Sequence, residues 1–159
     1  MTTSASFDNW LSPQQQSQWR TYLEGSALLW ATLNFDMEVH ANLSMSEYEI
    51  LVRLSERDGH RMRMSELADE LLHSRSRVSH TVRRLEKRKY VNRVPMARDK
   101  RGVVCELTDV GFGVLVQAAP DHVQSVRDRL VDVISEDEMT VLATIFRKVS
   151  LASGRVPPA

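Results

Sequence analysis

The chain has little of what marks several structural classes. A single cysteine, Cys105, leaves no internal disulfide, so we expect a reducing, cytoplasmic environment. Only 6 glycines and 5 prolines among 159 residues exclude collagen-like and low-complexity chains. The N-terminus lacks a basic run followed by an apolar run, and every apolar stretch is short, so we expect neither a signal peptide nor a membrane span. Because 42% of the residues are apolar, the chain can bury a core of its own.

The chain also lacks net charge, since 21 basic residues balance 21 acidic ones. The balance conceals an uneven distribution. The segment from His73 to Arg101 holds eleven basic and two acidic residues, a net charge of +9, which leaves −9 on the rest of the chain. Such a segment is either a solvated helix face beside a loop or a surface that binds phosphates, because clustered lysine and arginine release counterions from a polyanion.

Most of the chain has the periodicity and the start signals of helices. Capping boxes begin at Ser12, Ser44 and Ser135, and Thr108 is a further N-cap. Together with the apolar periodicity, these signals predict helices over about 12–41, 44–55, 65–72, 75–88, 108–134 and 135–151. Pro120 is expected to kink or break the fifth of them. The first helix has apolar residues on two sides, which indicates burial against a partner subunit.

The helical period stops between Tyr90 and Leu107. Apolar and polar residues alternate on both sides of a polar tip over 95–102, which predicts a two-stranded hairpin with a basic tip. The chain is therefore expected to be mainly α with a small β-hairpin. A short helix, a turn, a basic helix and a hairpin in this order are typical of a winged helix-turn-helix.

The basic helix over 75–88 is the predicted recognition helix. Val78, Val82 and Leu85 form its only apolar stripe, so its other side is expected to enter the major groove of DNA. The residues that we expect to contact DNA from this helix and its cap are Ser74, Arg75, Ser76, Arg77, Ser79, His80, Arg83 and Arg84. Among them, Arg77 and His80 are expected at base edges, whereas Arg83 and Arg84 are expected at phosphates.

The tip of the hairpin is the predicted wing. It carries Arg98, Lys100 and Arg101, which are expected to enter a narrow minor groove.

Several motifs together resemble the MarR family of winged-helix transcriptional regulators over nearly the whole chain. They are Leu67-Ala68, Ser74-Arg75-Ser76-Arg77, Arg84-Leu85-Glu86, Val91-x-Arg93, Asp99-Lys100-Arg101-Gly102 and Leu107-Thr108-Asp109-Val110-Gly111. The resemblance implies that Asp99 braces the wing while Arg101 enters the minor groove. It also implies a homodimer on a pseudo-palindromic double-stranded operator, with dimerisation helices over 12–41 and 108–151 around a DNA-binding domain over 44–107.

Lys89 departs from the pattern of this family, which usually has glycine directly after the recognition helix. A left-handed backbone is needed there and costs a non-glycine residue about 1 kcal/mol. Either the helix ends differently in this chain or the strain is tolerated.

The resemblance further implies a repressor that a small aromatic acid releases from DNA. We expect Arg20 to pair with the carboxylate of such a ligand, with Trp30 and His40 on the same helix. The alternative is that these residues belong to the dimer core or the surface. Cys105 lies among apolar residues of a predicted strand, which favours a buried structural thiol over a redox sensor.

Enzymatic and metal-binding functions have little support in the sequence. The 5 histidines form no pair at i, i+4 and no cluster with cysteine, so neither a metal nor another cofactor is expected. No nucleophile–base signature appears, which argues against an enzyme with a basic substrate groove. The remaining rival is a winged-helix module for protein interaction or DNA architecture that has no small-molecule effector.

Overall fold

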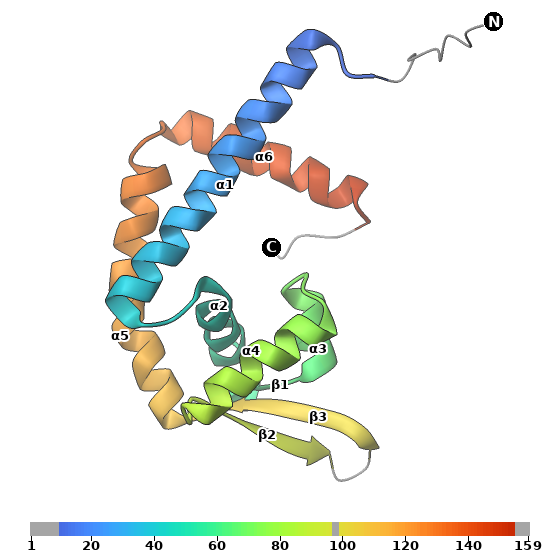
Figure 1. The fold of residues 1–159 in the computed structure, drawn as a ribbon, viewed down its shortest axis with the longest axis vertical. Coiled ribbons are helices and arrows are strands. Elements are labelled where there is room, and N and C mark those ends of the chain that lie inside the picture. The colour runs from blue at the N-terminus through green and yellow to red at the C-terminus, as the bar shows by residue number, and fades with distance from the viewer. Residues whose placement is uncertain (1–9, 97–98, 155–159) are drawn as a thin grey trace, which may run out of the picture. The chain divides into compact units, whose positions relative to one another are not determined.

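The computed structural model describes residues 10–96 and 99–154, and of residues 99–101 it describes the backbone alone. The elements of these ranges are α1 (Pro13–Ala41), α2 (Met45–Ser55), β1 (Arg61–Arg63), α3 (Met64–Glu70), α4 (Arg75–Lys87), β2 (Val91–Met96), β3 (Asp99–Leu107), α5 (Asp109–Val126) and α6 (Glu136–Ala152) (Figure 1). A 3-10 turn covers Asp58–His60 and a π turn covers Arg127–Val131. The chain divides into two compact units, one ending at Thr32 and the other beginning at Leu33. The prediction of a mainly α fold with a small β wing is confirmed.

The predicted caps start α1, α2, α5 and α6. In each, the side-chain oxygen accepts the backbone N–H three residues later, at 3.2 Å in Ser12, 3.3 Å in Ser44 and Ser135 and 3.0 Å in Thr108. In the three capping boxes, the serine N–H donates back to a Gln or Glu side chain at 2.8–2.9 Å. These bonds satisfy N–H groups that the first helical turn leaves unpaired.

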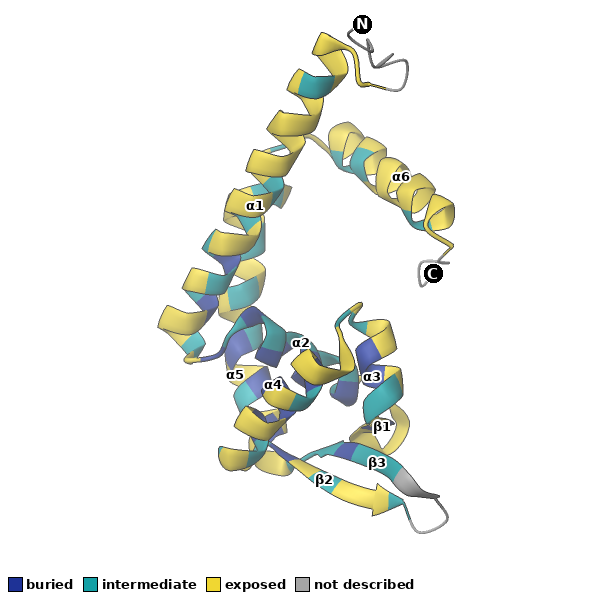
Figure 2. Ribbon diagram, turned by 45° about the vertical axis from the view of Figure 1, so that its right-hand side comes forward, coloured by how far each residue is buried: buried dark blue, intermediate teal, exposed yellow. Residues whose placement is uncertain are grey.

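The core of the second unit lies where α2, α3, α4 and the sheet meet, and buried positions concentrate there (Figure 2). The fully buried side chains at its centre are Leu51, Leu54, Leu67, Val82, Leu85, Val91 and Cys105. The predicted apolar stripe of α4 packs into this core. This packing determines which side of α4 remains exposed.

The sheet is antiparallel and has three strands in the order β1-β3-β2. The predicted hairpin forms β2 and β3, with Val91 opposite Leu107 and Arg93 opposite Cys105. On the other side of β3, Met62 of β1 pairs with Cys105. β1 was not predicted, because three residues are too few to show an alternating pattern.

Of the kink or break expected at Pro120, the break does not occur, and the kink stays a prediction. The helix continues through the proline to Val126, and the irregular π turn follows only after it. Proline deprives the carbonyl of Val116 of its helical partner. Since Val116 is 55% exposed, water can satisfy that carbonyl and the helix continues.

Candidate nucleic-acid interface

A helix-turn-helix is formed by α3, a tight turn and α4. The turn begins at Leu72, whose backbone is left-handed with φ +58°, and the N–H of His73 donates to the carbonyl of Ala68 at 3.1 Å. Ser74 then caps α4 by accepting the N–H of Arg77 at 3.2 Å. These local bonds turn the chain so that α4 packs across α2 and α3.

The side of α4 away from the core presents a row of exposed side chains, here called the outer face. Its members are Ser76, His80, Arg83 and Lys87, spaced three and four residues apart. Arg75 at the first position of the helix is also exposed, and Ser79 is half-buried. Within the described ranges, no hydrogen bond or ion pair is recorded for the side chains of Arg75 and Arg83. Cations placed in this way remain available to an external anion.

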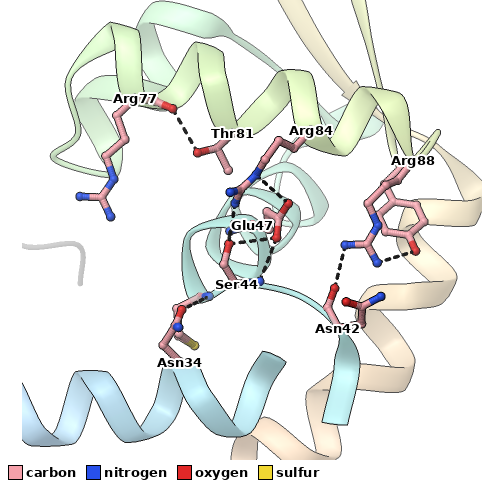
Figure 3. A network of polar contacts seen from close by, with 10 residues as sticks. Asn34, Asn42, Ser44, Glu47, Arg77, Thr81, Arg84 and Arg88 are labelled. Carbon is pink, nitrogen blue, oxygen red and sulfur yellow. Dashed lines mark hydrogen bonds and ion pairs between the residues drawn. The ribbon is translucent and has the colours of Figure 1, made fainter. Parts of the chain in front are cut away.

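Three other arginines of this region form hydrogen bonds or ion pairs with other residues of the protein, and they are here called the anchored arginines. Arg77 donates from Nη2 to the hydroxyl of Ser46 at 3.0 Å. Arg84 donates from Nη2 to Ser44 Oγ at 3.0 Å, and its Nε lies 3.2 Å from Oε1 of Glu47 (Figure 3).

Arg88, the third anchored arginine, donates to the carbonyl of Asn42 at 2.7 Å and to the hydroxyl of Tyr90 at 3.1 Å. Its guanidinium also lies over the Tyr90 ring, 4.6 Å from the ring centroid. The three anchored arginines therefore tie α4 to α2 and to the loop before it.

The partner of Arg84 is a buried carboxylate. Only 7% of the Glu47 side chain is exposed, and its Oε2 also accepts the N–H and the hydroxyl of Ser44 at 2.8 and 2.9 Å. A buried carboxylate requires such partners, because burial without them is costly. The periodicity of α4 could not reveal this pairing, which joins two helices distant in sequence. That Arg77 and Arg84 contact DNA therefore stays a prediction, and the structure adds an intramolecular role for both.

The junction between α4 and the wing depends on a strained residue. Lys89 has a left-handed backbone with φ +62°. Around it, the N–H of Tyr90 donates to the carbonyl of Leu85 at 3.0 Å and that of Lys89 to the carbonyl of Glu86 at 2.9 Å. This is the Schellman pattern that glycine usually completes. Of the two possibilities that the sequence left open, the chain adopts the strained left-handed ending.

An ion pair joins the hairpin to α4. Arg93 donates from Nε and Nη2 to Oε2 of Glu86 at 2.9 and 2.6 Å. These hydrogen bonds hold the pKa of Glu86 below its ordinary value and raise the pKa of Arg93. Because both side chains are about one third exposed, the pair orients the hairpin more than it stabilises the fold.

Gly111 explains the glycine of the motif that follows the hairpin. A Cβ at this position would lie 2.1 Å from the backbone oxygen of Tyr90 and 2.9 Å from Cδ1 of Leu107. The same oxygen accepts the N–H of Thr108 at 3.0 Å, and the Thr108 hydroxyl lies between this oxygen and the carbonyl oxygen of Lys89, at 3.0 and 2.8 Å. The start of α5 can therefore pack against the end of the recognition helix only where the side chain is a hydrogen atom.

The predicted DNA contacts at the tip lie largely outside the described residues. Arg98 is not described, and of Asp99, Lys100 and Arg101 only the backbone is described, as the first residues of β3. The expectations for these four residues, including the bracing role of Asp99, stay predictions.

The predicted ligand residues are divided between the two compact units, and their role in a ligand site stays a prediction. Arg20 and Trp30 are exposed on α1 within the first compact unit. His40 lines a cavity of about 10 Å³ together with Asp36, His122 and Ser125. This volume holds about one water molecule and no aromatic acid. His122 and Ser125 were not predicted, because they become neighbours of His40 only when the end of α1 packs against α5, and Asp36 lies one helical turn before His40 on α1.

Two polar groups beside this cavity have shifted pKa values. Ser125 donates a hydrogen bond to Asp36, which lowers the pKa of that carboxyl below its ordinary value, and Arg129 adds to the effect from 3.4 Å. Burial lowers the pKa of His122, whose ring lies 4.7 Å from that of Tyr48. Its Nδ1 has no hydrogen-bond partner within the described part of the chain.

Cys105 is fully buried, as expected, and burial raises the pKa of its thiol to about 12. Among the residues that the structure describes, no three His, Cys, Asp or Glu side chains gather where they could hold a metal ion. No described helix combines the length and the apolar character needed to cross a membrane.

Comparisons with known proteins agree with this geometry. The model of the MarR family matches residues 41–102. The structure is similar to that of AbsC, a MarR family transcriptional regulator from Streptomyces coelicolor, with 38% identity, a TM-score of 0.84 and coverage of 91% of this chain and 97% of AbsC. It is also similar to Sco3205, a MarR family regulator from the same organism solved in complex with DNA, with 39% identity, a TM-score of 0.87 and coverage of 94% of this chain and 92% of Sco3205.

A curated relative is the transcriptional regulator PecS of Dickeya dadantii. It is 31% identical over 108 residues, which are 67% of this chain and 64% of PecS. The chain therefore matches slightly less than two thirds of the length of that relative.

Proposed function

The chain belongs to the MarR family, and from this premise we propose that it is a sequence-specific regulator of transcription that binds double-stranded DNA in the cytoplasm. In this proposal α4 enters the major groove and the hairpin reaches the adjacent minor groove. The observation that supports it most directly is the outer face of α4. This face points away from the core and includes Arg83 and Lys87.

The outer face and the anchored arginines have separate roles in this proposal. His80 contacts base edges from the outer face, whereas Arg83 and Lys87 contact phosphates, which position the helix without specifying sequence. Arg84 fixes the orientation of α4 through Glu47, and any contact it makes with DNA is additional to this role. Arg83 and Arg84 are adjacent but have different proposed roles, so their alanine variants can be compared directly.

We further propose that the protein acts as a homodimer on a pseudo-palindromic operator. Support comes from the terminal helices, since α6 has no buried residue while Val141, Ile145 and Val149 are about half or more exposed. Apolar side chains in such number on one helix are typical of a surface that another protein covers. Two-fold symmetry would place two copies of α4 about one duplex turn apart.

The experiment that tests the proposal begins with footprinting of the full chain on DNA upstream of its own gene. Binding to the protected duplex is then followed by fluorescence anisotropy in excess random DNA. We expect binding to survive the competitor and the two half-sites to be about one turn apart. Binding that random DNA abolishes would instead support the rival function, a winged-helix module for architecture or protein interaction.

The matched variants Arg83→Ala and Arg84→Ala test the division of roles. Arg83→Ala is expected to reduce the salt dependence of binding by about one unit of slope per protomer, because one phosphate contact is lost. Its stability should stay within about 0.5 kcal/mol of wild type. Arg84→Ala should lower the free energy of unfolding by about 1–3 kcal/mol, because a buried carboxylate loses a partner. Equal effects of both variants on stability and on slope would refute the division.

Repression and its relief by a small aromatic acid complete the proposed function. The cavity beside His40 has a volume of only about 10 Å³. An aromatic acid could bind there only if the end of α1 and α5 separated. Titration with aromatic acids, followed by Trp fluorescence, tests this part with Arg20→Ala as the variant. Unchanged affinity in Arg20→Ala would remove Arg20 from the ligand site, and no response to any acid would favour a regulator without an effector.

A further inference from the structure

A groove of about 450 Å³ lies between the start of α3, the start of α4 and the two strands of the hairpin. Three arginines line it, namely Arg63 from β1, Arg75 from α4 and Arg93 from β2, together with the hydroxyl groups of Ser65 and Ser79. No carboxylate is among those of its lining residues that the structure describes. A concave surface with three guanidinium groups and two hydroxyl groups is suited to an anion with several oxygen atoms.

The arginines differ in how far they are engaged within the protein. Arg63 is only loosely paired with Glu66, with Nε and Oε1 3.9 Å apart, and 52% of its side chain is exposed. Arg75 is exposed at the first position of α4. Arg93 is committed to Glu86 through Nε and Nη2, but Nη1 takes no part in that pair. Arg63 and Arg75 are therefore the two groups best able to bind an external anion here.

The place of the groove identifies the anion. In a DNA duplex, one sugar–phosphate strand separates a major groove from the adjacent minor groove. A protein that inserts α4 into the major groove and the hairpin into the minor groove must straddle this strand, and the groove lined by Arg63 and Arg75 lies between these two elements. We propose that it holds backbone phosphates of that strand, with Arg63 and Arg75 as phosphate ligands. This assignment rests on the proposed function.

Arg63 is the DNA contact that this proposal adds, because it belongs neither to the recognition helix nor to the hairpin. It reaches the groove because β1 pairs with β3, where Arg63 lies opposite Val104. The same strand offers a matched control. Arg61 lies two residues earlier and on the same side of the sheet, but it faces Glu106 at 3.7 Å and does not line this groove.

The test measures operator affinity of the full chain between about 50 and about 200 mM salt for wild type, Arg63→Ala, Arg63→Lys and Arg61→Ala. For Arg63→Ala we expect the slope of log K against log salt to fall by about one unit per protomer. Its affinity should fall by a similar factor on operator and on random duplex, because phosphates carry no sequence information. Arg63→Lys should keep the slope, since it keeps the charge, and Arg61→Ala should behave as wild type.

Ethylation interference locates the contact. We expect phosphates whose ethylation weakens wild-type binding to lie between the major-groove and minor-groove footprints of each half-site. Ethylation of the phosphate that Arg63 contacts should no longer weaken the binding of the Arg63→Ala variant. If wild type binds its operator and Arg63→Ala keeps the full slope and the full interference pattern, the assignment is wrong while the proposed function stands. If wild type binds no duplex specifically, the proposed function fails, and the assignment fails with it.

Discussion

Alanine at Gly111 is expected to destabilise the junction between the recognition helix, the wing and α5. An added Cβ would lie 2.1 Å from the carbonyl oxygen of Tyr90, which is far inside van der Waals contact. The oxygen cannot retreat freely, because it accepts the backbone N–H of Thr108 at 3.0 Å. One or both elements must therefore move apart, and part of this hydrogen bonding is lost.

The magnitude follows from three contributions. Overpacking of this kind costs about 1–3 kcal/mol, and a weakened backbone hydrogen bond adds about 1 kcal/mol. The helix propensity of alanine is more favourable than that of glycine by about 1 kcal/mol, which offsets part of the cost. The net expectation for Gly111→Ala is a loss of about 1–3 kcal/mol in the free energy of unfolding.

Gly113 provides the matched control, because it lies in the same helix and a Cβ there would meet nothing within 4 Å. Gly113→Ala should therefore show the helical gain alone, up to about 1 kcal/mol of added stability. The assay is urea unfolding followed by far-UV circular dichroism at equal protomer concentration, since association changes apparent stability. If Gly111→Ala is as stable as Gly113→Ala, the Cβ at position 111 does not clash with the Tyr90 oxygen as proposed.

Three further predictions concern backbone strain, the thiol and acid stability. Lys89→Gly should raise the free energy of unfolding by about 0.5–1 kcal/mol by relieving the left-handed backbone, whereas Arg83→Gly inside α4 should lower it by a similar amount; equal losses would contradict the strain. Because burial raises the pKa of Cys105 to about 12, an aromatic disulfide reagent should react with it near pH 8 only in denaturant, and fast labelling of the folded protein would contradict its burial. Burial lowers the pKa of His122 below its ordinary value, so only the unfolded state takes up this proton near that value, and the free energy of unfolding should fall as the pH decreases from about 7 to about 5.5. His122→Phe should reduce this fall, and an unchanged pH dependence in urea unfolding would show that other groups cause it.

Much of the fold was predictable because its signals are local. An N-cap needs only a serine or threonine and the backbone three residues later, and the caps at Ser12, Ser44, Thr108 and Ser135 formed as expected. The apolar stripe of α4 likewise identified which side packs on the core. Pro120 shows the limit of a local rule, since proline disfavours a helix interior but an exposed carbonyl can tolerate the lost bond.

The candidate site was less predictable, because its arrangement depends on contacts between distant residues. Periodicity assigned Arg83 and Arg84 to one exposed side of a helix, whereas packing against α2 gave Arg84 a buried carboxylate as partner. Arg63 showed no signal in the sequence, because the strand that brings it to the groove has three residues and pairs with a strand far along the chain.

By itself, the sequence determined the order of the helices, the position of the hairpin and the concentration of charge between His73 and Arg101 within a chain of zero net charge. Composition and spacing along the chain are sufficient for these features, since caps, apolar periodicity and runs of charge do not depend on which distant residues pack together. Only the tertiary structure decided which of the basic residues have partners within the protein and which are available to an external anion, since a guanidinium pairs with the carboxylate that folding places beside it. It also explains why the Leu107–Gly111 motif ends in glycine: the backbone oxygen of Tyr90 lies too close to Gly111 for any side chain.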